Sequence, residues 1–258
     1  IQTDLNQFRA ERNRVSEEIA EVKRSGGDAN NAIAAMRDVG DKIKALEEKG
    51  DTIYNEIQSA LEVIPNTPHA SVPIGTHEKD NVVVKEWGEK PVFDYEIKDH
   101  LELGTNLNLF DFERAAKISG SAFPLYIGMG AKLERALINY MLDVHINEHG
   151  YTEIFPPFLT RGESAFTCGQ LPKFADDMYH TEKDQLYLIP TAEVPVTNIH
   201  ADEILNEDTL PINYTAYSAC SRREAGSYGK ETRGLLRVHQ FNKVELVKFV
   251  HPKQSYEE

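Results

Sequence analysis

The sequence is poor in long apolar runs, in cysteine and in positive charge, and each shortage excludes a class of protein. No segment approaches the roughly 18–20 consecutive apolar residues that span a bilayer, so we predict no membrane helix. The N-terminal stretch is charged and amphipathic and has no apolar core followed by a cleavage site, so nothing in it indicates secretion. Only Cys168 and Cys220 occur, in no metal-binding or disulfide spacing, which is typical of proteins of the reducing cytoplasm.

Positive charge is outweighed by negative charge. The chain has 28 Lys and Arg residues against 42 Asp and Glu residues, which gives a formal net charge of −14. Binding to nucleic acid is driven by clustered Lys and Arg, so this balance by itself argues against such a partner. RNA is often recognised by shape through local basic patches, however, so the net charge alone does not decide the question.

Common nucleotide and metal motifs are also missing. The sequence has no glycine-rich phosphate loop ending in Lys and Ser or Thr, and no dinucleotide fingerprint, so an ATP site would need another geometry. His145 and His149 stand four residues apart on a predicted helix, but no third ligand accompanies them. We therefore predict no metal site in the chain.

Residues 1–64 carry two runs of apolar residues at alternating spacings of three and four, separated by Gly26, Gly27 and Asp28. The first run is Ile1, Leu5, Phe8, Val15, Ile19 and Val22, with Arg12 as its one polar break. The second run is Ala32, Met36, Val39, Ile43, Leu46, Gly50, Ile53, Ile57, Ala60 or Leu61, and Ile64. Two heptad seams joined by a tight turn cover each other by folding back, so we predict an antiparallel coiled-coil hairpin. A coil that dimerises the chain is the alternative that these residues leave open.

Pro65 and Pro68 end the second helix and predict a domain boundary, with a helical domain at 1–66 and a second domain at 67–258. The chain begins without Met inside a helical pattern and ends without a terminating signal, so we expect a fragment of a longer protein.

The second domain mixes helical and strand patterns. The predicted strands are residues 82–85, 151–159, 186–189, 215–221 and 235–250. The predicted helices are residues 109–118 and 132–148, whereas 94–104 is expected to be irregular. One face of the 132–148 helix carries Leu133, Ala136, Leu137, Tyr140, Met141 and Val144. Few βαβ repeats occur, so we predict an α+β fold with an antiparallel sheet flanked by helices.

Arg222 lies near the end of a predicted strand, just before a glycine-bearing loop at 225–230. An arginine fork can clamp a carboxylate and a phosphate together, although a surface ion pair with Glu224 is the plainer alternative. Phe241 falls on the following strand, where its ring can cover a nucleobase or simply fill the core.

Thr191 and Glu193 are predicted to share one strand face, where a hydroxyl and a carboxylate can hold one small polar ligand. Glu245 lies in the apolar run 244–250, and a carboxylate buried there needs a partner, because burial of an unpaired charge is expensive. A substrate ammonium group or a Lys or Arg from elsewhere in the chain would serve equally well.

Taken together, these residues form a set of motifs. The set is Thr191-Ala192-Glu193, Arg222 and Glu224, Thr232-Arg233-Gly234, Arg237, Phe241 and Glu245, with 169–174 as a further motif. Their order and spacing resemble those of bacterial-type seryl-tRNA synthetases, a family of class II aminoacyl-tRNA synthetases. Residues 150–157 resemble the family's first signature, and the N-terminal hairpin resembles its tRNA-binding arm.

The resemblance implies a role for each site residue. Serine would be bound by Thr191, Ala192, Glu193 and Glu245. ATP would be bound by Arg222, Arg223, Glu224, the Val238 backbone and Phe241. Arg222 would also be the catalytic residue, holding the α-phosphate while the serine carboxylate attacks it.

The resemblance also implies partners. These are L-serine, ATP with Mg²⁺, tRNA(Ser) bound through the arm, and a second copy in a cytoplasmic homodimer, with the first signature in the interface. The family's third signature and its magnesium ligands are expected downstream of residue 258, so the 258 residues alone should not be a complete catalyst. Ser221, Ala219, Cys168 and Ala122 depart from the family pattern, and a catalytically impaired or carrier-protein-loading paralogue is the alternative function.

Overall fold

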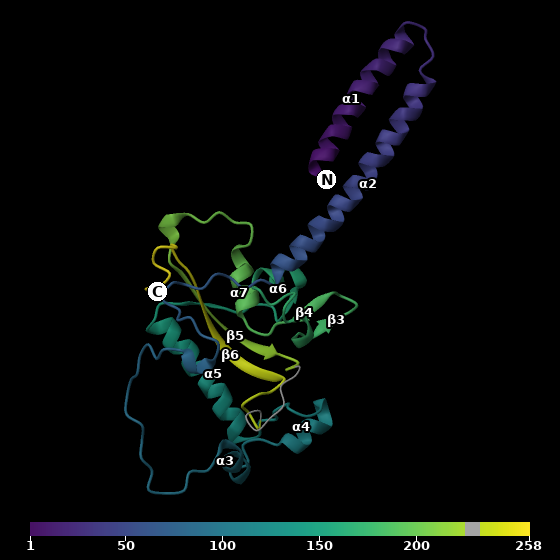
Figure 1. The fold of residues 1–258 in the computed structure, drawn as a ribbon. Coiled ribbons are helices and arrows are strands. Elements are labelled where there is room, and N and C mark those ends of the chain that lie inside the picture. Colours follow the sequence, from purple (N-terminus) through teal and green to yellow (C-terminus); the bar gives the residue numbers. More distant parts are fainter. Residues whose placement is uncertain (225–232) are drawn as a thin grey trace. The chain divides into compact units, whose positions relative to one another are not determined.

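The computed structural model describes residues 1–224 and 233–258, which form two units, Ile1–Val82 and Val83–Glu258. The first unit is dominated by two helices, α1 (Gln2–Arg24) and α2 (Asn30–Glu62), which run side by side and are joined by a short turn (Figure 1). The predicted domain boundary between residues 66 and 67 remains a prediction. The two units are defined by which residues contact each other, and this division does not test which part binds which partner.

The hairpin is held together by the predicted seam. Leu5, Val39 and Ile43 are buried between the helices, and Phe8 and Leu46 pack against them. Burial of such side chains in a seam of three- and four-residue spacing is what supplies a coiled coil with stability. The predicted antiparallel coiled-coil hairpin is confirmed.

The seam loses its partner along the second half of α2. Ile1 approaches Gly50, where a Cβ atom would lie 3.7 Å from its Cγ2 atom, so α1 covers α2 only up to this point. Beyond it, Ile57 and Leu61 are 51% and 54% exposed although they continue the apolar spacing. After α2 the unit has only the short helix η1 (Glu78–Asp80).

The prediction of a strand at 82–85 is wrong. Val82, Val83 and Val84 lie outside every strand and are 67%, 71% and 96% exposed. β-branched residues favour strands because they pack well on a pleated surface, and here the described residues provide no neighbouring strand on which to pack.

The second unit contains two three-stranded sheets. The larger has the order β1 (Thr152–Ile154), β5 (Ile212–Ser221) and β6 (Gln240–Phe249). β5 and β6 pair antiparallel over their whole length, from Ile212 with Phe249 to Ser221 with Gln240, whereas β1 runs parallel to β5. The smaller sheet is antiparallel, with the order β2 (Leu159–Arg161), β4 (Leu186–Leu188) and β3 (His180–Thr181). The α+β architecture is confirmed, with one parallel pair that makes the larger sheet mixed.

The sequence predicts β4 and β5 closely and the other strands less well. The run 151–159 holds β1 and only the first residue of β2. The two are separate strands of different sheets because residues 155–158, with two prolines, interrupt the run. Strand β6 begins at Gln240 and not at residue 235. Helix α3 (His100–Asn106) lies where an irregular segment is predicted, and its first turn is capped by Asp99, whose side chain accepts from the Glu102 amide at 2.8 Å.

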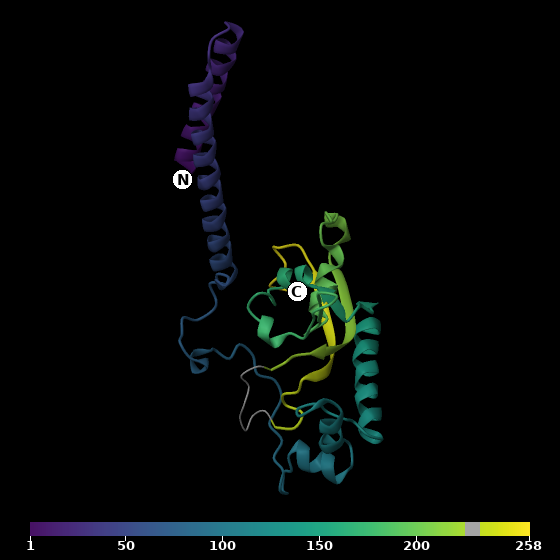
Figure 2. The same ribbon diagram turned by 90° about the vertical axis from the view of Figure 1, so that its right-hand side faces the viewer.

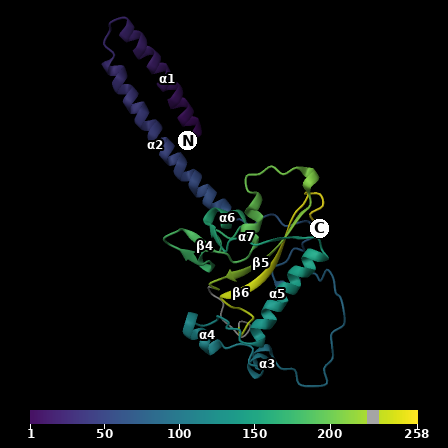
Figure 3. The same cartoon turned by 180° about the vertical axis from the view of Figure 1, so that it is seen from behind.

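The second unit has further helices, some of which pack on the sheets. They are α4 (Phe112–Ser119), α5 (Met129–Asn147), α6 (Gly162–Thr167), α7 (Glu193–Thr197), η2 (Ala175–Asp177), η3 (Asn198–His200) and η4 (Glu207–Thr209). Helix α5 runs along one face of the β5–β6 pair, and α7 packs on the opposite face (Figures 2 and 3). None of the described helices is long and apolar enough to cross a membrane.

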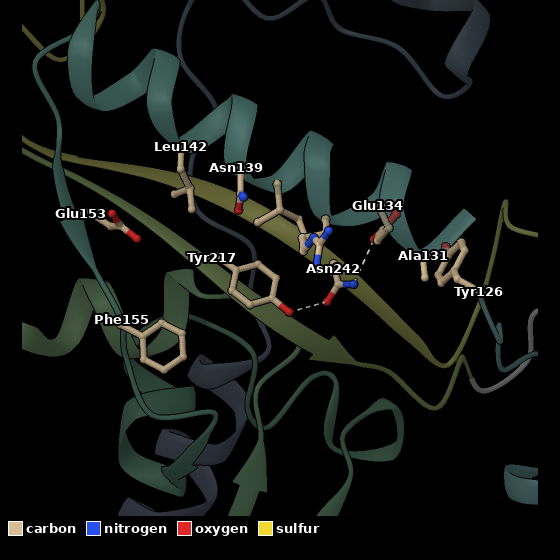
Figure 4. Close-up of a pocket in the computed structure, with 11 residues that line it drawn as sticks. Tyr126, Ala131, Glu134, Asn139, Leu142, Glu153, Phe155, Tyr217 and Asn242 are labelled. Carbon is tan, nitrogen blue, oxygen red and sulfur yellow. Dashed lines mark hydrogen bonds between the residues drawn. The ribbon is translucent and has the colours of Figure 1, made fainter. Parts of the chain in front are cut away.

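Helix α5 turns an unexpected side towards the sheet. Glu134 and Leu142 point from the helix towards the strands (Figure 4), and Ile138 lines the same space between helix and sheet. The predicted apolar face is therefore directed outward, and Leu137 and Tyr140 on it are 47% and 67% exposed. The helix itself is confirmed, but its apolar stripe does not belong to the core of this unit.

Candidate functional site

The register of β5 and β6 sets a row of side chains on one face of the sheet. Phe241, Lys243 and Glu245 alternate along β6 and so project to the same face. Opposite them on β5 lie Cys220, Ser218 and Ala216, three small and almost fully buried residues. Small neighbours leave the long side chains of β6 free to meet groups that approach from other elements.

Thr191 joins this row at the Glu245 end. Its hydroxyl group donates a hydrogen bond to the Glu245 carboxylate, and the Lys243 ammonium group lies 3.0 Å from the Thr191 hydroxyl and 2.5 Å from Glu245 Oε2. Thr191 is only 3% exposed, so the three groups form a compact polar cluster at the edge of the core. Of the two partners that the sequence allows for Glu245, a lysine of the chain occupies the position in this structure.

The strand predicted for Thr191 and Glu193 is not formed. β4 ends at Leu188, Ala192 has helical dihedral angles (φ −65°, ψ −14°), and Glu193 is the first residue of α7. The Thr191 hydroxyl accepts a hydrogen bond from the Glu193 amide at 3.2 Å, a local bond that competes with a strand ladder. As a result Thr191 and Ala192 are buried, whereas the Glu193 side chain is exposed.

Arg222 and Phe241 mark the other end of the row. The Arg222 guanidinium carbon lies 5.1 Å from the centre of the Phe241 ring, in a cation–π arrangement. The Arg222 amide donates to the His239 carbonyl at 2.9 Å, which extends the ladder one pair beyond β5 and fixes where the side chain begins. Phe241 is partly accessible, so it is not simply a core residue.

A pocket of about 270 Å³ opens beside Arg222. Its lining residues are Gln170, Phe174, Asp177, Met178, Pro190, Arg222, Glu224 and Arg237. Glu224 forms an ion pair with Arg237 within it, and not with Arg222, so the plainer alternative for Arg222 is not observed. Gln170 and Phe174 bring the predicted motif at 169–174 to this pocket.

The remaining predicted residues flank the pocket. The Arg223 amide donates to the Asp177 carbonyl at 2.7 Å, and the Arg223 side chain is exposed. Val238 is buried, and the next residue, His239, donates its amide to the Ala122 carbonyl at 2.9 Å. The predicted glycine-bearing loop at 225–230 and Thr232 lie outside the described residues.

Sequence reasoning missed Lys243. Lys243 lies two residues after Phe241 and two before Glu245 on one strand. Side chains alternate along a strand, so this spacing places Lys243 between the other two on the same face, and it is the signal from which the residue could have been found. Arg237 was recognised as part of the motif but without a role, because its ion pair with Glu224 joins positions that only the fold brings together.

A second pocket, of about 410 Å³, lies on the opposite face of the sheet, under α5 (Figure 4). The Tyr217 hydroxyl donates to Asn242 Oδ1 at 3.0 Å, and Asn242 Nδ2 donates to Glu134 at 2.9 Å. Burial, reinforced by the nearby Glu134 carboxylate, raises the pKa of Tyr217. The predicted site residues lie elsewhere, so this pocket is separate from the row on β6.

Metal ligands do not gather in the part of the chain that the structure describes. It contains no group of three His, Cys, Asp or Glu side chains that could hold an ion. His145 and His149 instead face each other, with 2.9 Å between their Nδ1 atoms.

Comparison with known proteins places both units in one family. Residues 1–68 match the seryl-tRNA synthetase N-terminal domain, and residues 173–258 match the class II tRNA synthetase core domain shared by the G, H, P, S and T enzymes. The serine–tRNA ligase of Chlorobium phaeobacteroides is 54% identical over 259 residues, which cover 98% of this chain and 59% of that protein. The chain belongs to the seryl-tRNA synthetase family. This chain spans about three-fifths of the length of the serine–tRNA ligases that it matches.

Two further members of the family support the assignment. The serine–tRNA ligase of Desulfosudis oleivorans is 55% identical and is matched over all of this chain and 61% of its own length. The crystal structure of seryl-tRNA synthetase from Pyrococcus horikoshii, complexed with ATP, superposes with a TM-score of 0.83 at 36% identity, covering 99% of this chain and 62% of that one. The fold prediction is thus confirmed as that of the family.

The structure shows the contacts of two residues that depart from the family pattern, Ser221 and Cys168. Ser221 ends β5, and its amide donates to the Ile189 carbonyl at 3.0 Å, so the strand that leads to Arg222 is held by its backbone whatever side chain stands there. The Cys168 thiol lies 3.4 Å from Asn198 Nδ2, and burial raises its pKa.

Proposed function

We propose that the protein activates L-serine with ATP to form seryl-adenylate and then transfers the seryl group to tRNA(Ser). The observation that carries this proposal is the row on one sheet face. A carboxylate and a buried hydroxyl stand at one end of the row, and an arginine with an aromatic ring stands at the other. An amino acid and a nucleotide bound at these two ends would meet between them.

Glu245 and Thr191 are suited to the ammonium group of serine. A carboxylate accepts charge-assisted hydrogen bonds, and the Thr191 hydroxyl beside it adds a second acceptor at a fixed position. We assign Ala192 and Glu193 to the same serine site, because they follow Thr191 directly at the start of α7.

Phe241 and Arg222 are suited to ATP. A nucleobase that stacks on the Phe241 ring would place its phosphates beside the Arg222 guanidinium group, which stands against the same ring. Glu224 lines the adjoining pocket, and we assign Glu224, Arg223 and the Val238 backbone to the remaining ATP contacts.

The reaction needs no covalent bond to the protein. A carboxylate oxygen of serine attacks the α-phosphorus of ATP, a new P–O bond forms, and the bond to pyrophosphate breaks. Arg222 would stabilise the negative charge that builds on the α-phosphate, and the row would supply the alignment. ATP is used with Mg²⁺, but the described residues do not provide a ligand set, so we assign no step to the metal.

The remaining partners follow from the family. We propose that the α1–α2 hairpin binds tRNA(Ser), that two copies form a homodimer, and that the protein works in the cytoplasm. We also keep the division into a tRNA-binding arm at 1–66 and a catalytic domain at 67–258 as part of the proposal.

Serine-dependent exchange of pyrophosphate into ATP tests the proposal. The protein expressed from its complete reading frame should catalyse exchange with serine, and much more slowly with threonine or alanine, and should charge tRNA(Ser). Exchange without charging would instead favour a ligase that loads another carrier. The absence of exchange with every amino acid would refute the proposed function.

A further inference from the structure

The Thr191 hydroxyl and the Glu245 Oε2 atom, the two acceptors nearest each other in the Thr191–Lys243–Glu245 cluster, are already engaged by groups of the chain. The Thr191 hydroxyl donates to Glu245 and accepts from the Lys243 ammonium group at 3.0 Å and from the Glu193 amide at 3.2 Å. A hydroxyl group has one hydrogen to donate and two lone pairs, so these three bonds fill it. The Glu245 oxygen that it contacts also carries the Lys243 ammonium group at 2.5 Å.

A substrate ammonium group that binds the Glu245 carboxylate therefore meets the ammonium group of Lys243 already there. Two ammonium groups on one carboxylate repel each other, and the repulsion is strong in a partly buried site because water screens it poorly. Thr191 is 3% exposed, and the Glu245 side chain is 16% exposed, whereas the Lys243 side chain is 34% exposed. Lys243 is also the only one of the three with a long flexible stem, so it is the group that moves.

The strand geometry limits where the displaced ammonium group can go. Phe241 precedes Lys243 by two residues on the same face, which is a distance of roughly 6.6–6.8 Å along a strand. The cross-strand neighbour of Lys243 is Ser218, a small buried residue that does not block movement along the face. A lysine that leaves Glu245 therefore remains between the serine end of the row and Arg222.

We propose that Lys243 is a further catalytic residue that exchanges one carboxylate for another. In the empty site its ammonium group neutralises Glu245. When serine binds, the substrate ammonium takes over Glu245, and Lys243 moves to the serine carboxylate and the α-phosphate oxygens that the carboxylate attacks. This inference rests on the proposed function, since it assumes that serine and ATP occupy the two ends of the row.

Steady-state pyrophosphate exchange by the complete protein tests the inference. Lys243→Met keeps the stem and removes the charge, and we expect it to lower kcat by roughly 10²-fold, as for other groups that stabilise charge in a transition state. KM for serine should stay the same or fall, because the competing ammonium group is gone. Lys243→Arg should recover a large part of kcat, because it restores the charge.

Lys248→Met is the matched control. Lys248 lies on the same strand but has the opposite parity, and its ammonium group contacts Glu258 at 2.6 Å. It should leave both constants within about twofold of the wild type. A rise in KM for serine with kcat unchanged, or no change in either constant for Lys243→Met, would overturn the inference and leave the proposed function standing. If the wild-type protein shows no serine-dependent exchange, both the inference and the proposed function are refuted.

A crystal structure of the wild-type protein with a non-hydrolysable seryl-adenylate analogue gives a second test that requires no variant. We expect Lys243 Nζ to lie beyond about 4 Å from Glu245, the limit for an ion pair, and within hydrogen-bond distance of the acyl or phosphate-mimicking oxygens. Lys243 still seated on Glu245 with the analogue bound would contradict the exchange of partners.

Discussion

At the scale of single residues, we expect loss of the Thr191 hydroxyl to weaken serine binding. Thr191→Val keeps the shape and removes the hydrogen bond to Glu245. Hydrogen bonds to charged groups contribute about 1.5–3 kcal/mol, so we expect KM for serine to rise roughly 10- to 100-fold in pyrophosphate exchange.

Thr215→Val is the matched control for this prediction. Thr215 lies on β5 and is fully buried, and its hydroxyl group has no hydrogen-bond partner among the described residues. The substitution should change neither KM nor kcat by more than about twofold, because it removes no bond. An equal effect of the two substitutions would show that Thr191 acts through packing and not through its hydroxyl.

The two cysteine residues give a pH-dependent prediction at the same scale. Burial raises the pKa of the thiol groups of Cys168 and Cys220 above their ordinary value. The folded state therefore favours the neutral thiol, and this contribution to stability is complete below about pH 8.5, the ordinary cysteine pKa, and is lost as pH rises through the folded-state values.

Alkylation by iodoacetamide, followed by peptide mass spectrometry, measures the thiolate directly. At pH 7.5 both cysteines should react more slowly in the native protein than in urea, and Cys168 should react before Cys220, which is fully buried. As the pH is raised, the alkylation rate of the native protein should increase at a higher pH than that of the urea-unfolded protein, because the folded-state thiol pKa values are higher. Equal native and unfolded rates at pH 7.5 would contradict the effect of burial.

At the scale of secondary-structure elements, the α1–α2 seam should depend on its covered half. Ile43 is 4% exposed between the helices, and Ile43→Ala should destabilise the hairpin by about 2–4 kcal/mol. Ile57 continues the same spacing but is 51% exposed, and Ile57→Ala should cost less than about 0.5 kcal/mol. Hydrogen exchange of the α1 amides measures both, and comparable acceleration by the two substitutions would show that the seam is covered along its whole length.

Elements with a long regular pattern could be predicted from the sequence, and short ones could not. The heptad spacing gave the hairpin, the alternation at 235–250 gave β6 apart from its start, and the amphipathic spacing at 132–148 gave α5. The residues 82–85 and 191–193 misled because local β-branched or polar patterns do not say whether a neighbouring strand or a capping bond will be present. Lys243 was missed for a related reason, since its contact with Thr191 joins positions 52 residues apart.

At the scale of the whole molecule, the two units predict a division of labour. Every residue of the candidate site belongs to the unit Val83–Glu258, and none comes from the hairpin. Removal of residues 1–66 from the complete protein should therefore leave serine-dependent pyrophosphate exchange within a few-fold of the wild type. Charging of tRNA(Ser) should fall much more, by at least 10²-fold on the order-of-magnitude scale of lost phosphate contacts. Equal loss of both activities would refute the predicted arm.

The outward face of α5 predicts that two copies associate through it. Leu133, Leu137 and Tyr140 are 52%, 47% and 67% exposed. Apolar side chains gathered on one exposed helix face mark interfaces, and truncation of an aromatic or aliphatic anchor in an interface commonly costs about 2 kcal/mol or more, which corresponds to roughly 30-fold in affinity. Tyr140→Asp also places a charge in the patch, so it should shift a dimer towards monomer by at least that factor in sedimentation equilibrium.

Tyr54→Asp is the matched control, because Tyr54 is 62% exposed on α2, in the other unit, and should leave the dimer intact. Wild-type protein that sediments as a monomer at micromolar concentration would refute the homodimer. A dimer weakened by Tyr54→Asp and not by Tyr140→Asp would place the interface on the coiled coil, which is the alternative that the heptad spacing of residues 1–64 leaves open. The two substitutions thus separate an interface on α5 from one on α2.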